Sequence, residues 1–220
     1  MTATDAEYFH FLPRFLEQVR EVFPSASVTV YDLGMNYIQQ EKIYAQLVRC
    51  RPWRKKKTDG KYPEGYYPRA LHKPHMLYHA HRHLHGPILY LDVDAYPVSH
   101  FEMPDCDVAV TKKNILSVAQ YANTPLEEYL GFLDAGVIML GADEKRELFL
   151  AKWAKDMQDD PSPSDQKSLN RVVGEGDYNT TRELDIGGDT LKIHILHEGI
   201  YNSSFMHPEA KIVHLRVHEQ

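Results

Sequence analysis

One apolar run, Ile88-Leu-Tyr-Leu-Asp-Val-Asp-Ala, constrains the fold more than any other part of this sequence. Successive apolar residues without helical spacing are typical of a central strand that is covered on both faces. The run leads into two aspartates, Asp92 and Asp94. Alternation along the strand predicts that both carboxylates lie on one side where the strand leaves the sheet, which is the edge at which open α/β sheets bind ligands.

The rest of the chain alternates between helical and extended patterns. Apolar spacing predicts helices over residues 8–22, 36–44, 76–84, 144–157 and 165–173. Short apolar or β-branched runs predict strands over residues 27–32, 45–50, 87–92, 106–111, 132–140, 191–196 and 211–215. This order favours an α/β fold with a mainly parallel central sheet flanked by helices. The length of 220 residues, without a repeat or a linker, predicts a single domain over residues 1–220.

Composition excludes several classes of protein. A formal net charge of -6 argues against a general nucleic-acid partner. Two cysteines, Cys50 and Cys106, make no disulfide framework and fit a reducing compartment. No apolar run is long enough for a membrane span, and the first residues lack the pattern of a signal peptide. We therefore expect a cytoplasmic protein.

The two aspartates suggest a bound cation. Adjacent carboxylates repel each other unless a cation lies between them, and their hard oxygens suit Mg²⁺ or Mn²⁺, which commonly share their ligands with substrate phosphates. The alternative is that Asp92 and Asp94 only cap a turn. A buried strand in front of the pair favours the metal site.

The order of motifs resembles that of the metal-dependent GT-A glycosyltransferases, closest to glycosyltransferase family 8 and related nucleotide-diphospho-sugar transferases. The segments that carry the resemblance span nearly the whole chain: Thr2-Ala-Thr-Asp-Ala-Glu-Tyr8, Val28-Thr-Val-Tyr-Asp-Leu-Gly34, Leu89-Tyr-Leu-Asp-Val-Asp94, Phe132-Leu-Asp-Ala-Gly-Val137, Ser164-Asp-Gln-Lys-Ser-Leu-Asn170 and Ile212-Val-His-Leu215. The resemblance implies a GT-A fold, a Rossmann-like arrangement that binds a nucleotide sugar.

The resemblance also implies site residues. The metal ligands for Mn²⁺ or Mg²⁺ would be Asp92, Asp94 and His214. The UDP-sugar donor would contact Thr4, Asp5, Tyr8, Lys73, Asp92 and Val93. Asp134, Asp165 and Gln166 would be catalytic, with Gln166 beneath the anomeric carbon.

Each role has a structural alternative. Asp5 can cap the helix that follows it, and Asp165 and Gln166 can serve the first turn of theirs. Lys73 can be a solvated lysine, and His214 an ordinary histidine at the end of a strand.

Several features depart from the pattern or lie outside it. Asp134 stands where the family usually has asparagine, and Val217 stands where it has glycine, without the lysine that should follow. Arg216 or Lys73 would then contact the diphosphate. A basic loop from Arg51, with nearby tyrosines that can stack on sugars, is expected to be mobile. Histidines at helical spacing over residues 72–85 offer a weaker alternative for zinc.

These observations predict a glycosyltransferase that transfers a sugar from a UDP-sugar to a hydroxyl of a carbohydrate or glycoconjugate acceptor. Retention of the anomeric configuration, with the released UDP phosphate as the base, is implied by the resemblance. Two alternatives stay open. One is a sugar-phosphate nucleotidyltransferase, although the segment after the first strand is neither glycine-rich nor basic. The other is a nucleotide-sugar-binding module without transfer activity.

Overall fold

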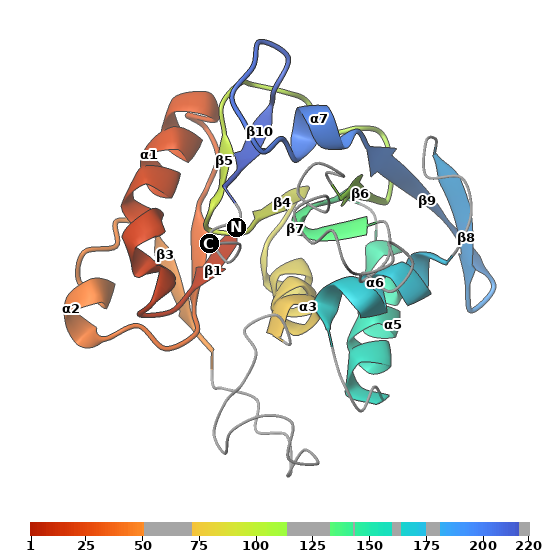
Figure 1. Ribbon diagram of the computed structural model, residues 1–220. Helices are drawn as coiled ribbons and strands as arrows, with labels where there is room; N and C mark the ends of the chain where they lie inside the picture. Colours follow the sequence, from red (N-terminus) through yellow and green to blue (C-terminus); the bar gives the residue numbers. More distant parts are fainter. Residues whose placement is uncertain (51–71, 114–132, 143, 160–163, 175–180, 216–220) are drawn as a thin grey trace, which may run out of the picture.

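The computed structural model describes residues 1–50, 72–113, 133–142, 144–159, 164–174 and 181–215 (Figure 1). The predicted loop from Arg51 with its tyrosines, together with Arg216 and Val217, lies outside these residues. In the described part of the chain, no helix is long and apolar enough to cross a membrane.

The strands and helices follow one another along the whole chain. The strands are β1 (Thr2–Thr4), β2 (Thr29–Asp32), β3 (Gln46–Arg49), β4 (Ile88–Leu91), β5 (Ala95–Pro97), β6 (Val108–Lys112), β7 (Leu133–Leu140), β8 (Arg182–Ile186), β9 (Asp189–Leu196) and β10 (Ile212–His214). The helices are the 3₁₀-helix η1 (Tyr8–Phe11), α1 (Leu12–Val22), α2 (Tyr37–Gln40), α3 (Lys73–His83), α5 (Arg146–Asp159), α6 (Asp165–Val173) and α7 (Glu198–Tyr201).

The strands form two main sheets that Met1 connects. One sheet has the order β1-β2-β3 with parallel pairs, and the other has the order β4-β7-β6-β9-β8. The amino group of Met1 donates to the carbonyl of Leu89, and the carbonyl of Met1 accepts from the backbone N–H of Leu91. This is the pattern of a parallel pair, so β1 and β4 end at the same edge. A separate antiparallel pair, β5 with β10, lies above that edge (Figure 1).

Apolar side chains cover both faces of the sheets. Along β7, Ala135, Ile138 and Leu140 pack with α3, α5 and α6, whereas Val137 and Met139 face the other way, toward the layer that contains α1. The helices in Figure 1 lie accordingly, α1 beside β1 and β3, and α3, α5 and α6 beside β4 and β7. Burial on both faces explains why the central strands are apolar throughout.

The predicted α/β class is confirmed, with a more varied pairing than the sequence suggests. Parallel pairing holds for β1, β2 and β3 and between β6 and β9, while β7 is antiparallel to both of its neighbours, β4 and β6. A buried apolar run has the same composition in either direction, so the sequence does not fix the direction of β7.

Candidate active site

Asp92, Asp94 and His214 come together at the edge where β4 ends. One ligand atom from each residue lies within 4.8 Å of the other two, and this is the one such group that the described residues contain. β4 ends at Leu91, and residues 92–94 form a turn in which the N–H of Ala95 donates to the carbonyl of Asp92. The predicted proximity therefore arises from a turn and not from strand alternation.

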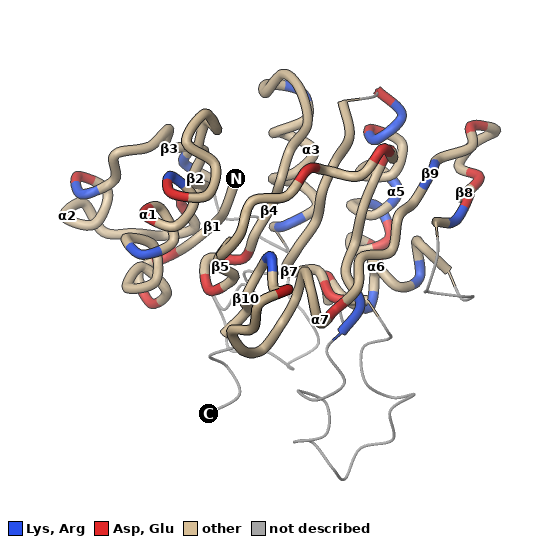
Figure 2. The backbone as a smooth tube through the Cα atoms, turned by 90° about the horizontal axis from the view of Figure 1, so that it is seen from above, with Lys and Arg blue, Asp and Glu red and all other residues tan. Residues whose placement is uncertain are grey.

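The pairing of β5 with β10 brings His214 to the two aspartates. Ala95, the residue after Asp94, pairs with His214, and the backbone N–H of Leu215 donates to the carbonyl of Asp94. The Nε2 atom of His214 lies 3.4 Å from Oδ1 of Asp94. Figure 2 shows β5 and β10 side by side near the end of β7, with acidic positions among them.

Burial and charge act against each other at these residues. Burial raises the pKa of Asp92, while the charges of Lys73 and His214 oppose that rise. Burial lowers the pKa of His214, but its hydrogen bond and attraction to Asp94 raise it above the usual value for histidine. The site therefore attracts positive charge, either a proton or a cation.

Lys73 is buried between two of the predicted site residues. Its ammonium lies 2.8 Å from Oδ2 of Asp165 and 3.0 Å from Oδ1 of Asp92, and it donates to the carbonyl of Ala135 at 2.9 Å. Burial alone would lower the pKa of Lys73, but Asp165 and Asp92 raise it well above its ordinary value. The alternative of a solvated lysine is wrong: Lys73 is buried against one catalytic candidate, Asp165, and one candidate metal ligand, Asp92.

Asp134 and Gly136 form the floor of the site on β7. The backbone N–H of Gly136 donates to Oδ1 of Asp134 at 2.7 Å, and its carbonyl accepts from the N–H of Asp92 at 2.8 Å. A Cβ atom at Gly136 would lie 3.0 Å from a carboxylate oxygen of Asp134 and of Asp92, and closer still to His214. Glycine is thus required where the backbone approaches three predicted site residues.

Asp165 and Gln166 begin helix α6, and Asn170 attaches that helix to β7. The side chain of Asn170 accepts from the N–H of Leu133 at 3.0 Å and donates to the carbonyls of Leu133 and Gln166. Oδ1 of Asp165 accepts from the backbone N–H of Gln166, so Asp165 does interact with the first turn of α6, as the structural alternative predicted. The Oε1 atom of Gln166 is buried and has no hydrogen-bond partner within the described part of the structure.

The residues predicted to hold the nucleotide lie at the end of β1. Thr4 is the last residue of β1 and is buried. Asp5 follows it, and one oxygen of its carboxylate accepts from the backbone N–H groups of Glu7 and Tyr8 in the turn before η1, although Glu7 and not Asp5 is the N-cap of that helix. The side chain of Val93 packs in the apolar core next to α1. Because β1 and β4 end at the same edge of the sheet, the residues that follow β1 and those that follow β4 lie at that edge.

The histidines of α3 make separate contacts. His79 Nδ1 lies 2.8 Å from the hydroxyl of Tyr31, and its ring centre lies 4.3 Å from that of His83. His81 Nδ1 accepts from Arg146. These contacts tie the helix to its neighbours.

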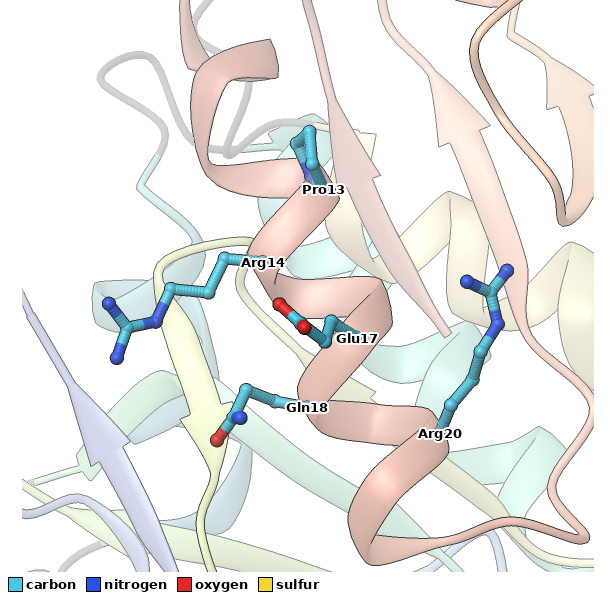
Figure 3. A pocket seen from close by; sticks show the side chains of 5 residues that line it. All are labelled: Pro13, Arg14, Glu17, Gln18 and Arg20. Atoms are coloured by element: carbon cyan, nitrogen blue, oxygen red, sulfur yellow. The ribbon is translucent and has the colours of Figure 1, made fainter.

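A surface hollow on α1 contains none of the predicted site residues. It is lined mostly by exposed side chains: Pro13, Arg14, Glu17, Gln18 and Arg20 (Figure 3). The guanidinium of Arg14 lies 5.7 Å from the centre of the Tyr96 ring. We assign no chemistry to this hollow.

Sequence reasoning missed three residues at the site. Tyr90 donates a hydrogen bond of 2.7 Å to Oδ1 of Asp92, and Asn202 lies 2.9 Å from Nδ1 of His214. Gly136 belongs to the segment Phe132-Leu-Asp-Ala-Gly-Val137, but no role in the site was predicted for it. A glycine in an apolar strand is a recognisable signal of close backbone approach, whereas nothing in the sequence around Asn202 marks it.

Comparison with known proteins gives a result only at the level of structure. No protein-family profile matches the sequence, and no curated protein sequence matches it. Among solved structures, the galactosyltransferase LgtC in complex with donor and acceptor sugar analogues superposes with a TM-score of 0.55 at 14% identity, over 97% of this chain and 85% of that one.

This chain has the GT-A glycosyltransferase fold. A second structure of LgtC, described as an active-site mutant in which a glutamine is replaced by glutamate, matches with a TM-score of 0.55 at 12% identity, over the same shares of the two chains. The apo structure of the bifunctional glycosyltransferase WbbM matches with a TM-score of 0.56 at 12% identity, over 98% of this chain and 45% of that one. The GT-A fold expected from the order of motifs is confirmed.

Proposed function

We propose that this protein is a metal-dependent glycosyltransferase that transfers a sugar from a UDP-sugar to an acceptor hydroxyl with retention of configuration. The observation that carries the proposal is the meeting of Asp92, Asp94 and His214 at the ligand-binding edge of a GT-A fold. Among the predicted catalytic residues, Asp134 meets Asp92 and His214 around Gly136, and Asp165, the residue before Gln166, shares Lys73 with Asp92.

The residues present fit a divalent cation. Two carboxylates and one imidazole are ligands that Mn²⁺ accepts, and Mg²⁺ suits the carboxylates. Their ligand atoms all lie within 4.8 Å of one another, so the three side chains could hold one ion between them. Bound there, the cation would neutralise the negative charge that develops on the departing diphosphate.

The protein's own residues would bind and orient the donor. Lys73 fixes the carboxylates of Asp92 and Asp165 by direct contact, so their positions do not depend on the substrate. Gln166 holds a buried amide oxygen without a partner in the described residues, which is a group able to face a sugar carbon that gains positive charge. In LgtC, the residue replaced in the active-site mutant is likewise a glutamine, which supports this role for Gln166.

The remaining contacts belong to the proposal as well. Thr4, Asp5 and Tyr8 at the end of β1, and Val93 in the turn after β4, would contact the UDP-sugar donor. Asp134 would face the donor sugar. A carbohydrate or glycoconjugate acceptor, a cytoplasmic location and a single domain over residues 1–220 remain predictions.

Thermal unfolding with a panel of nucleotides and nucleotide sugars, with and without Mn²⁺, tests the proposal. A ligand that binds the native state raises the Tm according to its affinity and concentration. We expect UDP and one UDP-sugar to raise the Tm only with Mn²⁺, and Asp94→Asn to abolish this effect. Glu17→Gln, on the outer face of α1, serves as a control of equal charge change and should respond as the unmodified protein does.

The outcomes separate the alternatives. Metal-dependent donor binding followed by release of UDP in the presence of an acceptor supports a transferase. Binding without turnover favours a nucleotide-sugar-binding module. Release of pyrophosphate from UTP and a sugar phosphate favours a nucleotidyltransferase. No response to any uridine nucleotide would contradict the proposal.

A further inference from the structure

Asn202 is a buried amide that connects two parts of the chain beside the predicted metal ligands. It follows helix α7 and is fully buried. Its Nδ2 donates to the backbone carbonyl of Lys112 at 3.0 Å, and its Oδ1 lies 2.9 Å from Nδ1 of His214. A buried amide with both ends in contact with fixed groups has a single orientation.

The contact with Lys112 determines which way the amide faces. A backbone carbonyl only accepts hydrogen bonds, so the NH₂ group of Asn202 must face Lys112 and its Oδ1 must face His214. An amide oxygen also only accepts, so Nδ1 of His214 must carry the proton of this hydrogen bond. In the imidazolium, Nε2–H faces Asp94 as well, but the neutral imidazole, which is the form that binds a metal ion, has one N–H and leaves a lone pair on Nε2.

We propose that Asn202 is a positioning residue that selects the Nδ1–H tautomer of His214 and thereby presents Nε2 to the metal ion. The inference rests on the proposed metal-dependent function. Nε2 lies 3.4 Å from Oδ1 of Asp94, so this tautomer places a lone pair opposite a carboxylate, an arrangement that a shared cation relieves. Partners of the second ring nitrogen commonly tune a histidine ligand in this way.

The competing tautomer shows why the choice matters. If Nε2 carried the proton, His214 would donate it to Asp94 and the two ligands would bind each other instead of a cation. Asn202 disfavours this state because its Oδ1 would then face an Nδ1 lone pair. Loss of such a partner weakens metal affinity by about 10- to 100-fold.

Mn²⁺ titration by electron paramagnetic resonance, without nucleotide or acceptor, tests the inference. Asn202→Leu keeps the branching at Cγ and removes both hydrogen bonds, and we expect Mn²⁺ affinity to fall about 10- to 100-fold. Asn202→Asp keeps an acceptor toward Nδ1 and places a carboxylate oxygen instead of a donor against the carbonyl of Lys112, so most of the affinity should return. Ser203→Ala, which removes the two hydrogen bonds between the Ser203 hydroxyl and the backbone of Phe205, is the matched control and should bind Mn²⁺ normally.

The results distinguish this inference from the proposed function. If the unmodified protein does not bind Mn²⁺, the metal-dependent function fails. If it binds Mn²⁺ and Asn202→Leu binds equally well, or Asn202→Asp is as weak as Asn202→Leu, only the tautomer inference fails.

A second measurement does not depend on whether the Asn202 variants fold. Long-range ¹⁵N–¹H spectra of the unmodified protein in EDTA, recorded at alkaline pH, report the tautomer of His214 directly. The spectrum of His214→Gln assigns the signal among the 13 histidines. An Nδ1–H tautomer supports the inference, and an Nε2–H tautomer overturns it.

Discussion

Replacing Gly136 with alanine adds one methyl group where three predicted site residues meet. The new Cβ would lie 3.0 Å from Oδ2 of Asp92 and 3.0 Å from Oδ1 of Asp134, and closer still to Cε1 of His214. Non-bonded heavy atoms prefer separations of about 3.5–4.0 Å. The carboxylates must therefore retreat by a few tenths of an ångström and the imidazole by roughly 1 Å.

The size of this movement sets the expected loss of metal binding. Ligand distances in a metal site are held to within about 0.2 Å, so a shift of this size exceeds the tolerance. We expect Mn²⁺ affinity to fall about 100-fold, the scale of a displacement of about 1 Å in a functional site. Overpacking should also cost about 1–3 kcal/mol of stability, or roughly 2–4 °C in Tm for each kcal/mol.

Gly141→Ala separates the two effects. A Cβ at Gly141 would collide with the backbone carbonyl of Cys106, at the far end of β7 from the site. This variant should lose at least as much stability as Gly136→Ala, as measured by thermal unfolding, yet bind Mn²⁺ normally. Normal Mn²⁺ affinity in Gly136→Ala would refute the reasoning, because the ligands would then tolerate a methyl group that the structure excludes.

Two other perturbations follow from burial. Lys73→Met breaks buried ion pairs and should cost about 3–5 kcal/mol in EDTA. The loss should be larger at pH 7.5 than at pH 5, because Asp92, whose pKa is already raised and rises further without Lys73, can become neutral at the lower pH; an equal loss at both would contradict this. The thiols of Cys50 and Cys106 have pKa values raised by burial to about 11. They should react with a disulfide reagent at pH 8 about 10-fold more slowly than an exposed thiol, since a roughly 100-fold smaller thiolate fraction is partly offset by greater nucleophilicity. Reaction at the rate of glutathione would contradict the raised pKa values of these partly buried thiols.

Elements with strong local signals were predictable. Helix α6 (Asp165–Val173) has the predicted bounds, because Ser164 caps its first turn and its apolar residues have helical spacing. The hairpin of β8 and β9 also has a strong local signal, but only a strand over residues 191–196 was predicted from the sequence, and none for β8. Gly187 and Gly188 form its two-residue turn, and both have positive φ angles of 67° and 92°, which suit glycine.

The candidate site was predictable only in part. Asp92, Asp94 and His214 could be selected from their order along the chain. What brings them together could not be predicted, because a turn after β4 and the pairing of Ala95 with His214 depend on the whole fold. The role of Asn202 could not be predicted either, because its side chain donates a hydrogen bond to the carbonyl of Lys112, which is distant in the sequence.

The pairing of β5 with β10 affects how firmly the last described strand is attached to the rest of the fold. Asp94 and His214 are separated by some 120 residues, yet β10 reaches the rest of the fold mainly through a short antiparallel pair. A cation bound by both residues would act as a removable cross-link between two positions that are far apart in the sequence. Release of the cation would then be coupled to the loosening of β10. Binding of the cation and the donor would stabilise the pairing of β10 with β5, and that pairing would in turn strengthen their binding.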